Sequence, residues 1–446
     1  LATSGIYAGG PVTYLPLPWA PAPAMQRLAY TSEAWVCRNK SPNTDPAPLR
    51  SLGCTRVNRN VNVRADVDQP SVTFTLEVDR LGNGQWAELR RVEVPARGYH
   101  WTRFDAQERG AWIRLRADRD CAHATAFFTG RNRDPRTTAA DVRFDGLAAT
   151  NTPGLTGGLL HARGQDKQTL GVAALHRAAD GAVTEGYYEM GPDMVLRRAE
   201  DAAALQWTKK SVAIPRDVIA IDAASVIYTD EQGRRFRLPK GREDATLEGP
   251  LGLERIDREV CTERDLLNCG GTFFELPAEN AGGVAKIRPI STHNRRIHDY
   301  ASWRGLLVLT GIEDGARGTR PHLIRSSDGH AAVWVGAVDD LWSFGKAVGV
   351  GGPWHDTAVQ PGQASDPYLM TGYDRKTLTL SHRASEAVAM RVEVDLSGTG
   401  RWVEYRQFTV PAGVKVTHPF QAGFQAYWLR VTADHATTAS AHLVYQ

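Results

Sequence analysis

Hydrophobic and polar residues alternate along most of the chain. Segments such as VTFTLEVD (72–79), MRVEVD (390–395) and YWLRVTAD (427–434) carry apolar side chains at every second position, and turn-forming clusters separate many of them. LLVL at 306–309 is wholly apolar, which is typical of a central strand buried on both faces. Helical periodicity is scarce, and the best helical candidate is the Ala-rich stretch from about residue 196. The pattern predicts an all-β fold.

One stretch of sequence occurs twice. EVDRLGNGQWAELRRVEVPA at 77–96 matches EVDLSGTGRWVEYRQFTVPA at 393–412, and the match continues without a gap through Trp112 and Trp428. We infer duplicated units at about 72–130 and 388–446.

Two architectures accommodate these copies. One is a central β domain flanked by two duplicated β-sandwich modules. The other is a single β-propeller domain over 1–446, with about seven blades and a ring closed by the N- and C-terminal strands. We favour the propeller because closing the ring removes exposed sheet edges.

Composition excludes several classes of protein. The chain has 446 residues, of which 42% are hydrophobic and 23% charged, as in ordinary globular proteins. Its formal charge is only +3 and its basic residues are scattered, which disfavours nucleic acid as a partner. No apolar run approaches the roughly 18 residues of a membrane span, so none is predicted.

The cysteines and the first residue bear on the compartment. Cys37 and Cys54 flank one loop and Cys261 and Cys269 bracket another, and both spacings suit disulfides formed in an oxidising space. No Cys/His spacing matches a zinc site. The sequence begins with Leu, which suggests a removed leader. We therefore expect a secreted or periplasmic protein.

The densest group of chemically useful side chains lies in RRIHDYASWRG at 295–305. Along an extended chain, Arg296, His298 and Tyr300 would point to one side. Histidine and tyrosine can exchange protons, and arginine can neutralise a carboxylate with two hydrogen bonds. The candidate catalytic residues are His298, Tyr300, Arg296, Arg304 and Asp299. The structural alternative is a turn in which Asp299 pairs with an arginine.

A second set of residues is predicted to bind substrate. It comprises histidines, arginines and aromatic residues in other strand-like segments. The tryptophans either stack on sugar rings or wedge between adjacent sheets. These candidates are His293, His161, His176, Arg163, Tyr188, Arg325, Trp334 and Trp342.

A family resemblance rests on the repeat together with RRIHDYASWRGLLVLTG (295–311) and DPYLMTGYDRKTLTLSH (366–382). These features resemble the secreted seven-bladed propellers that act on uronate-containing polysaccharides, among them rhamnose–glucuronate lyases, exo-α-L-rhamnosidases and ulvan lyases. The resemblance implies proton transfer by histidine and tyrosine and an arginine that holds the uronate. It also implies that no cofactor is required, although a structural calcium or other divalent cation is compatible with it; the metal ligands are unknown.

The expected function is cleavage of an acidic oligo- or polysaccharide by β-elimination. In this mechanism an arginine neutralises the uronate, while a base removes the C5 proton and an acid protonates the leaving oxygen. One alternative is an exo-acting, α-L-rhamnosidase-like hydrolase, which needs two facing carboxylates such as Asp299 with Asp339 or Glu189. Another alternative is a propeller that binds glycans without cleaving them.

Overall fold

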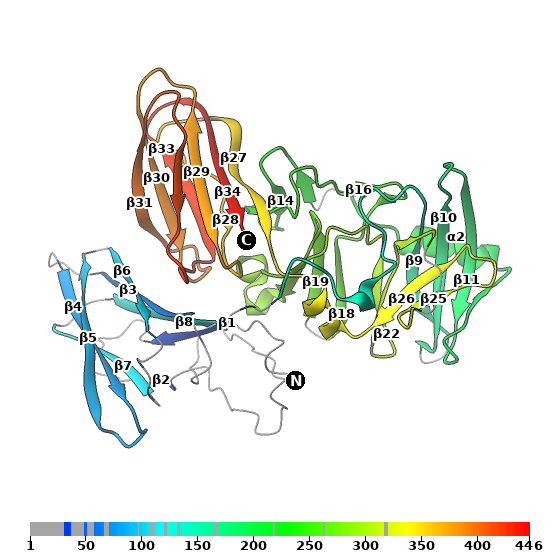
Figure 1. Cartoon of the computed structure of the whole chain (residues 1–446), viewed down its shortest axis with the longest axis horizontal. Helices are drawn as coiled ribbons and strands as arrows, with labels where there is room; N and C mark the ends of the chain where they lie inside the picture. The colour runs from blue at the N-terminus through cyan, green and yellow to red at the C-terminus, as the bar shows by residue number, and fades with distance from the viewer. Residues whose placement is uncertain are drawn as a thin grey trace. The chain divides into compact units, whose positions relative to one another are not determined.

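The structure of the chain is a computed structural model. It describes strand positions at 31–36, 49–50 and 58–66, and residues 71–446 apart from 97, 106–107, 109, 111, 120–122, 132–133, 135, 165–166, 217–218, 262–263 and 316–319. The described residues form two compact units: unit 1 holds those before 136 together with 356–441, and unit 2 holds 136–355 together with 442–446. Strands dominate both units, so the all-β class is confirmed (Figure 1).

The N-terminal part of unit 1 consists of two four-stranded antiparallel sheets, with the orders β2-β7-β4-β5 and β1-β8-β3-β6. Every second side chain of β4 is buried, and Phe74 and Leu76 cluster with Phe104 and Phe128 of the other sheet. This packing makes a β-sandwich. The strands are β1 Thr31–Val36, β2 Leu49–Arg50, β3 Asn58–Asp66, β4 Ser71–Asp79, β5 Trp86–Pro95, β6 Tyr99–Phe104, β7 Trp112–Ala117 and β8 His123–Arg131.

The C-terminal part of the chain repeats this arrangement strand for strand. β28, β33, β30 and β31 pair in that order, and β27, β34, β29 and β32 form a second sheet. The duplication therefore includes β1–β3 and β27–β29, and it begins earlier in each copy than the predicted residues 72 and 388. The strands are β27 Gly349–Val359, β28 Tyr368–Leu369, β29 Lys376–His382, β30 Val388–Asp395, β31 Trp402–Val410, β32 Val416–Pro419, β33 Trp428–Ala433 and β34 Thr437–Tyr445.

The two copies also share side-chain contacts. In the first copy a β-bulge lies between Leu76 and Glu77, and Arg114 pairs with Glu77 at 2.5 Å while lying over the Trp86 ring at 4.2 Å. The second copy has the same three features at the matching positions: a bulge between Val392 and Glu393, Arg430 paired with Glu393 at 2.8 Å, and Arg430 over Trp402 at 4.4 Å. Cross-strand contacts of this kind stabilise the pairing of neighbouring strands.

Unit 2 is built from small antiparallel sheets. Three of them have the orders β12-β11-β10-β9-β24, β18-β19-β20-β21 and β22-β23-β26-β25, while β13, β14 and β15 pair in sequence and β16 pairs with β17. The strands are β9 Leu155–Arg163, β10 Thr169–Arg177, β11 Val183–Met190, β12 Leu196–Arg198, β13 Ile219–Ile221, β14 Val226–Thr229, β15 Arg235–Leu238, β16 Glu248–Gly249, β17 Gly252–Leu253, β18 Asp257–Cys261, β19 Arg264–Cys269, β20 Thr272–Pro277, β21 Arg288–Thr292, β22 Tyr300–Trp303, β23 Leu306–Leu309, β24 Ile312–Glu313, β25 Leu323–Arg325 and β26 Ala332–Gly336.

The described residues of unit 2 also form helix α2, Ala202–Ser211, and four short 3₁₀ helices. The 3₁₀ helices are η1 Val142–Phe144, η3 Glu279–Ala281, η4 Gly283–Lys286 and η5 Val338–Ser343. The apolar strand predicted at 306–309 is β23, which lies between β22 and β26 with Leu307, Val308 and Leu309 fully buried. Its side chains enter two separate apolar cores on its two faces.

The strand pairing places each repeat copy in a two-sheet sandwich, as in the first of the two architectures considered above. Unit 2 supplies four-stranded antiparallel sheets of the kind found in propeller blades. A closed seven-bladed ring over 1–446 stays a prediction.

The predicted disulfide between Cys261 and Cys269 is wrong. Cys269 carries a free, buried thiol. In the β18–β19 hairpin Cys261 pairs with Arg264, whereas Cys269 lies at the other end of β19. Five residues of strand separate these ends by about 16 Å, and bonded cysteines have Cα atoms within about 7 Å of each other. Cys37 and Cys54 lie outside the described residues.

Candidate functional site

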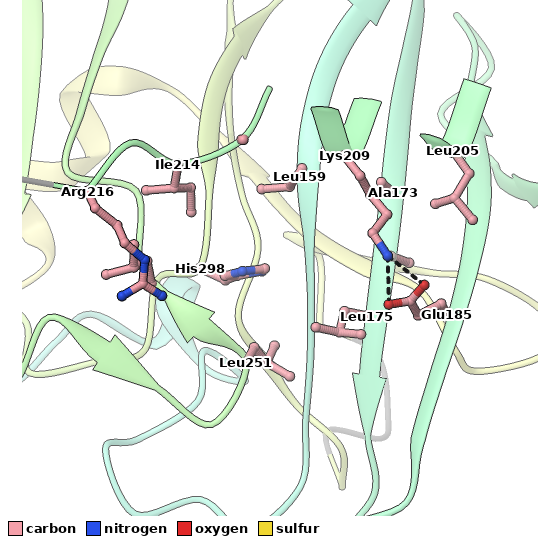
Figure 2. A pocket seen from close by; sticks show the side chains of 13 residues that line it. Leu159, Ala173, Leu175, Glu185, Leu205, Lys209, Ile214, Arg216, Leu251 and His298 are labelled. Carbon is pink, nitrogen blue, oxygen red and sulfur yellow. Dashed lines mark hydrogen bonds and ion pairs between the residues drawn. The ribbon is translucent and has the colours of Figure 1, made fainter. Parts of the chain in front are cut away.

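A pocket of about 290 Å³ lies in unit 2 beside α2 and the β9–β10–β11 sheet. Four polar side chains line it: Glu185, Lys209, Arg216 and His298. Figure 2 shows His298 between Arg216 on one side and the Lys209–Glu185 ion pair on the other. Small-ligand sites commonly have such a mainly apolar lining with a few polar groups. The apolar lining consists of Leu159, Ala173, Ala174, Leu175, Leu205, Ala213, Ile214, Leu251 and Leu253.

Strand alternation determines which side chains reach the pocket. Leu159 lines it, whereas the next residue, Leu160, is fully buried in the apolar core behind the sheet. Leu159 lies directly opposite Ala173 on β10, so the two pocket-facing side chains are neighbours. The face of the sheet that includes Leu159 is therefore the wall of the pocket.

Helix α2 forms a second wall. It begins where the Asp201 side chain accepts a hydrogen bond from the Ala204 amide at 2.8 Å. Leu205 and Lys209 lie one turn apart on the helix, and both line the pocket. The Lys209 ammonium contacts the two carboxylate oxygens of Glu185 at 2.9 and 3.0 Å. This ion pair is partly exposed, and pairs of that kind contribute only about 0–1 kcal/mol, so a ligand can replace either partner.

His298 is the most buried polar group in the pocket, with 7% of its surface exposed. Its Nδ1 accepts a hydrogen bond from the Gly158 amide at 2.9 Å. Burial lowers the pKa of His298; the Asp299 carboxylate opposes this shift and the Arg255 guanidinium adds to it. The ring is therefore neutral near pH 7, and because Nδ1 is an acceptor its proton is on Nε2. Among the described residues Nε2 has no hydrogen-bond partner, which leaves a donor for a ligand.

Gly157 leaves the space that His298 occupies. A Cβ at this position would lie 2.4 Å from Leu251 Cδ1 and 2.6 Å from His298 Nδ1. We expect Gly157→Ala to displace the imidazole and to lower the free energy of unfolding by about 1–3 kcal/mol. Urea unfolding and the NMR signals of the His298 ring measure the two effects.

Gly191→Ala is the matched control, because its Cβ would approach only Asp193, at 3.5 Å. If both variants unfold at the same urea concentration as the wild type, Gly157 is not needed for the position of His298.

The next residue, Asp299, anchors this segment from behind the pocket. It is fully buried and pairs with Arg255 at 2.8 Å and with Arg258 at 3.3 Å. It also accepts hydrogen bonds from the Leu160 and Tyr300 amides, each at 2.8 Å. Because all its partners belong to the protein, Asp299 holds the fold together rather than facing a ligand.

Tyr300 does not share the pocket with His298. Its ring is fully buried, and its hydroxyl lies 2.5 Å from the Leu266 carbonyl oxygen and 3.1 Å from that of Ile256. Burial raises the pKa of Tyr300 well above its ordinary value. The predicted alternation does not hold because β22 begins only at Tyr300, so the residues from Arg296 to Asp299 are not in a strand. Tyr300 therefore has no surface that a ligand in the pocket could contact.

The two predicted arginines occupy other places. Arg296 pairs with the Glu254 carboxylate at 3.2 Å, and burial raises the pKa of that carboxyl to about 7 against the lowering effect of Arg296. Arg304 is exposed, with its guanidinium 5.7 Å from the centre of the Trp303 ring. Neither guanidinium lines the pocket.

Three other predicted residues have structural partners away from the pocket. Burial lowers the pKa of His293 to about 3, and its ring bonds to Asn268 Oδ1 at 3.1 Å and to the Arg295 amide at 2.9 Å. His176 and Tyr188 lie on the opposite face of the sheet from the pocket. His176 bonds to Thr156 Oγ1 at 3.0 Å, and Tyr188 donates to Asp328 at 2.7 Å.

The predicted tryptophans belong to the interior. Trp334 is fully buried, stacks on Phe144 with ring centres 5.0 Å apart and donates to the Arg143 carbonyl oxygen at 2.6 Å. Trp342 is partly buried against the same core. The Arg325 guanidinium donates to the carbonyl oxygens of Glu313 and Gly329 at 3.0 and 3.2 Å. These contacts favour the packing alternative for the tryptophans.

Two predicted residues lie on the pocket face of the sheet. His161 follows Leu159 on that face of β9, and its ring centre is 4.5 Å from that of Trp207 on α2. Arg163, the next residue on this face, donates to the Tyr187 hydroxyl at 2.8 Å. The structure therefore brings His298, His161 and Arg163 to one side of one sheet.

Sequence reasoning did not select Lys209, Arg216, Glu185 or Trp207. The alternation of β11 gives a partial signal, because Glu185, Tyr187 and Glu189 fall on one face of that strand. The return of α2 across the sheet is a tertiary contact, and no local pattern in the sequence reports it.

Within the described part of the chain, no group of three or more His, Cys, Asp or Glu side chains is arranged to hold a metal ion. A structural cation stays a prediction. No helix among those residues is long and apolar enough to cross a membrane.

Comparisons with known proteins give no family. No family model matches the chain, and no curated protein matches it. Among solved structures, the PBSX exported protein XepA aligns over 94% of this chain and 87% of its own with 9% identity and a TM-score of 0.16. The tandem CBM22 modules of Paenibacillus barcinonensis Xyn10C align over 93% and 91% with 8% identity and a TM-score of 0.15. A structure described as a glycoside hydrolase covers 65% and 83% with 11% identity and a TM-score of 0.14. Structural similarity at this level supports no conclusion about the fold or the function of this chain.

Proposed function

We propose that the pocket binds an acidic sugar residue of a glycan. The observation that carries this proposal is the neutral His298, whose Nε2–H is held toward a largely apolar cavity between Lys209 and Arg216. A hydrogen-bond donor that faces the cavity without a protein partner favours a polar ligand, and the cations on either side favour an anionic one.

The lining suits a sugar ring that carries a carboxylate. The aliphatic side chains of Leu159, Leu175 and Leu251 can contact the C–H groups of a pyranose. The Arg216 guanidinium is exposed and pairs with Glu248 at 2.8 Å. Guanidinium groups bind carboxylates through two parallel hydrogen bonds, and an exposed ion pair is exchanged at a cost of about 0–1 kcal/mol.

Binding of D-glucuronate, compared with D-glucose, tests the proposal by calorimetry. We expect glucuronate to bind more tightly and His298→Asn to weaken its binding by about 10–100-fold, the equivalent of one hydrogen bond to a charged group. Asparagine keeps an acceptor near the Gly158 amide but lacks the Nε2 donor.

Arg304→Ala is the control, since Arg304 is an exposed cation that does not line the pocket. If glucose binds as well as glucuronate, or if His298→Asn leaves the affinity unchanged, the proposal is wrong.

A second candidate function is β-elimination at the bound uronate. It is favoured by Arg216, His298 and Glu185 all lining one cavity. In this reaction a base takes the C5 proton, a C4=C5 double bond forms, the C4–O bond breaks and the leaving oxygen takes a proton. We assign the carboxylate to Arg216, the C5 proton to Glu185 and the donated proton to His298 Nε2. Hydrolysis is less favoured, because Glu185 is the one carboxylate among the described lining residues and hydrolysis ordinarily needs two.

Incubation with ulvan and gum arabic separates these reactions. A rise in ultraviolet absorbance that Glu185→Gln abolishes supports elimination, because only elimination creates a conjugated double bond. New reducing ends without absorbance indicate hydrolysis, and bound but unchanged glycan indicates a binding protein. Secretion or a periplasmic location stays part of the proposal, although the free Cys269 removes one of the two disulfides on which it was based.

A further inference from the structure

Trp207 is an exposed aromatic side chain next to the pocket. Half of its surface, 50%, is exposed, and in the part of the chain that the structure describes it is the only aromatic among the large hydrophobic side chains so exposed. One side of the ring is held by His161, at 4.5 Å between ring centres. A half-exposed indole ring presents a flat apolar face on which the ring of a ligand can stack.

Trp207 lies close to the pocket along the surface of the sheet, because its contact residue His161 is on the pocket face of β9. His161 lies two residues after Leu159 on the same face of β9, a separation of roughly 7 Å. On α2, residues two apart point to different sides of the helix, so Trp207 lies on another flank than Leu205 and Lys209, and only its contact with His161 on β9 connects it to the pocket face. A chain-like ligand leaving the pocket along this face therefore reaches Trp207 next.

Hydrogen-bond donors and acceptors both surround Trp207. The Arg163 guanidinium donates to the Tyr187 hydroxyl at 2.8 Å and pairs with Glu189 at 3.3 Å and Asp201 at 3.8 Å. Arg163 and Glu189 keep about a third of their side-chain surface exposed, at 35% and 37%. Sugar hydroxyls both donate and accept hydrogen bonds, so a mixed set of donors and acceptors beside an aromatic ring matches a pyranose.

Gly171 keeps Tyr187 flat against the sheet. Gly171 lies opposite both His161 and Glu189, and a Cβ on it would be 2.2 Å from the Tyr187 hydroxyl oxygen. The absent side chain lets the Tyr187 hydroxyl lie between these two neighbours, where Arg163 meets it. The surface around Trp207 is thus level with the pocket wall.

We propose that Trp207, His161, Arg163 and Glu189 form a second sugar subsite, in which the buried Tyr187 positions Arg163, and that the site takes an oligosaccharide along the β9–β10–β11 face. This inference rests on the proposed function, because the first sugar occupies the His298 pocket. It extends that function by identifying the ligand as a chain of several residues, bound by stacking at one position and by charge at the other.

Calorimetry with D-galacturonate and with tetragalacturonate tests the subsite. We expect the wild type to bind the tetramer at least about tenfold more tightly than the monomer. Trp207→Ala should remove that tenfold gain and leave the affinity for the monomer within about twofold. Val195→Ala, which truncates another exposed apolar side chain of unit 2 at 45% exposure, should change neither affinity.

The outcomes separate the two proposals. If the wild type binds monomer and tetramer equally, or if Trp207→Ala keeps the tenfold gain, the subsite is wrong while the pocket stands. If the wild type binds neither sugar, the subsite is wrong; the proposed function is wrong with it if D-glucuronate also fails to bind. An unchanged thermal midpoint for Trp207→Ala shows that any loss reflects contact with the ligand and not unfolding.

Discussion

Replacing Asp299 by Ala is expected to lower the free energy of unfolding by about 3–5 kcal/mol. Asp299 is fully buried, and its carboxylate compensates the guanidinium groups of Arg255 and Arg258, whose side chains are 8% and 23% exposed. Removing it leaves two cations in a poorly solvated place and removes the acceptor of the Leu160 amide. Urea unfolding followed by circular dichroism measures the loss.

Two further variants make this result interpretable. Asp299→Asn keeps the size of the side chain and removes its charge, so it separates charge compensation from packing. Asp180→Ala removes a carboxylate that accepts from the Ala182 amide in an exposed turn and should change stability by less than about 0.5 kcal/mol. A loss below about 1 kcal/mol for Asp299→Ala would mean that both arginines find other partners.

Glu254 is expected to make the stability of the protein fall as the pH rises from 4.5 to 7. Burial raises the pKa of this carboxyl from 4.5 in the unfolded chain to about 7 in the folded protein. Between these values the folded state binds the proton and the unfolded state does not, so a rising pH favours unfolding. A shift of this size corresponds to about 3 kcal/mol between the two ends of the window.

Glu254→Gln should remove that part of the pH dependence while keeping an acceptor for Arg296. The measurement is urea unfolding of wild type and variant at pH 5 and pH 8, with Glu248→Gln, a neighbouring exposed glutamate, as the control. Parallel pH profiles for the wild type and Glu254→Gln would contradict the assignment.

Local patterns in the sequence were sufficient to predict the strands and the duplicated stretch. β4 and β23 follow their alternating and apolar patterns because burial acts on each strand through its own side chains. The disulfide prediction was wrong because the spacing of two cysteines does not reveal a hairpin between them. The bend at 295–299 likewise broke the alternation that had placed Tyr300 beside His298.

The candidate site could be predicted only in part. His298 lines the pocket, and His161 and Arg163 lie on the sheet face that forms its wall. These three could be predicted from the sequence, because each belongs to a segment whose polar residues interrupt apolar runs. Lys209 and Trp207 come from a helix that follows β12 and folds back onto the sheet to which β12 belongs, with Thr208 buried and Leu205 lining the pocket. Such a contact depends on the whole fold, and a single sequence does not report it.

The duplicated sandwich has a consequence for biosynthesis. Two copies with matching strands and matching Arg–Trp contacts offer each other's strands as competing partners, which is a known route to misassembly in proteins with repeated domains. Residues 132–348 separate them along the chain, so at ribosomal speeds the second copy emerges roughly 10–40 s after the first. That delay lets the first copy close its sheets before a rival strand exists. The delay caused by synthesis of the intervening residues therefore favours strand pairing within each copy over pairing between the copies.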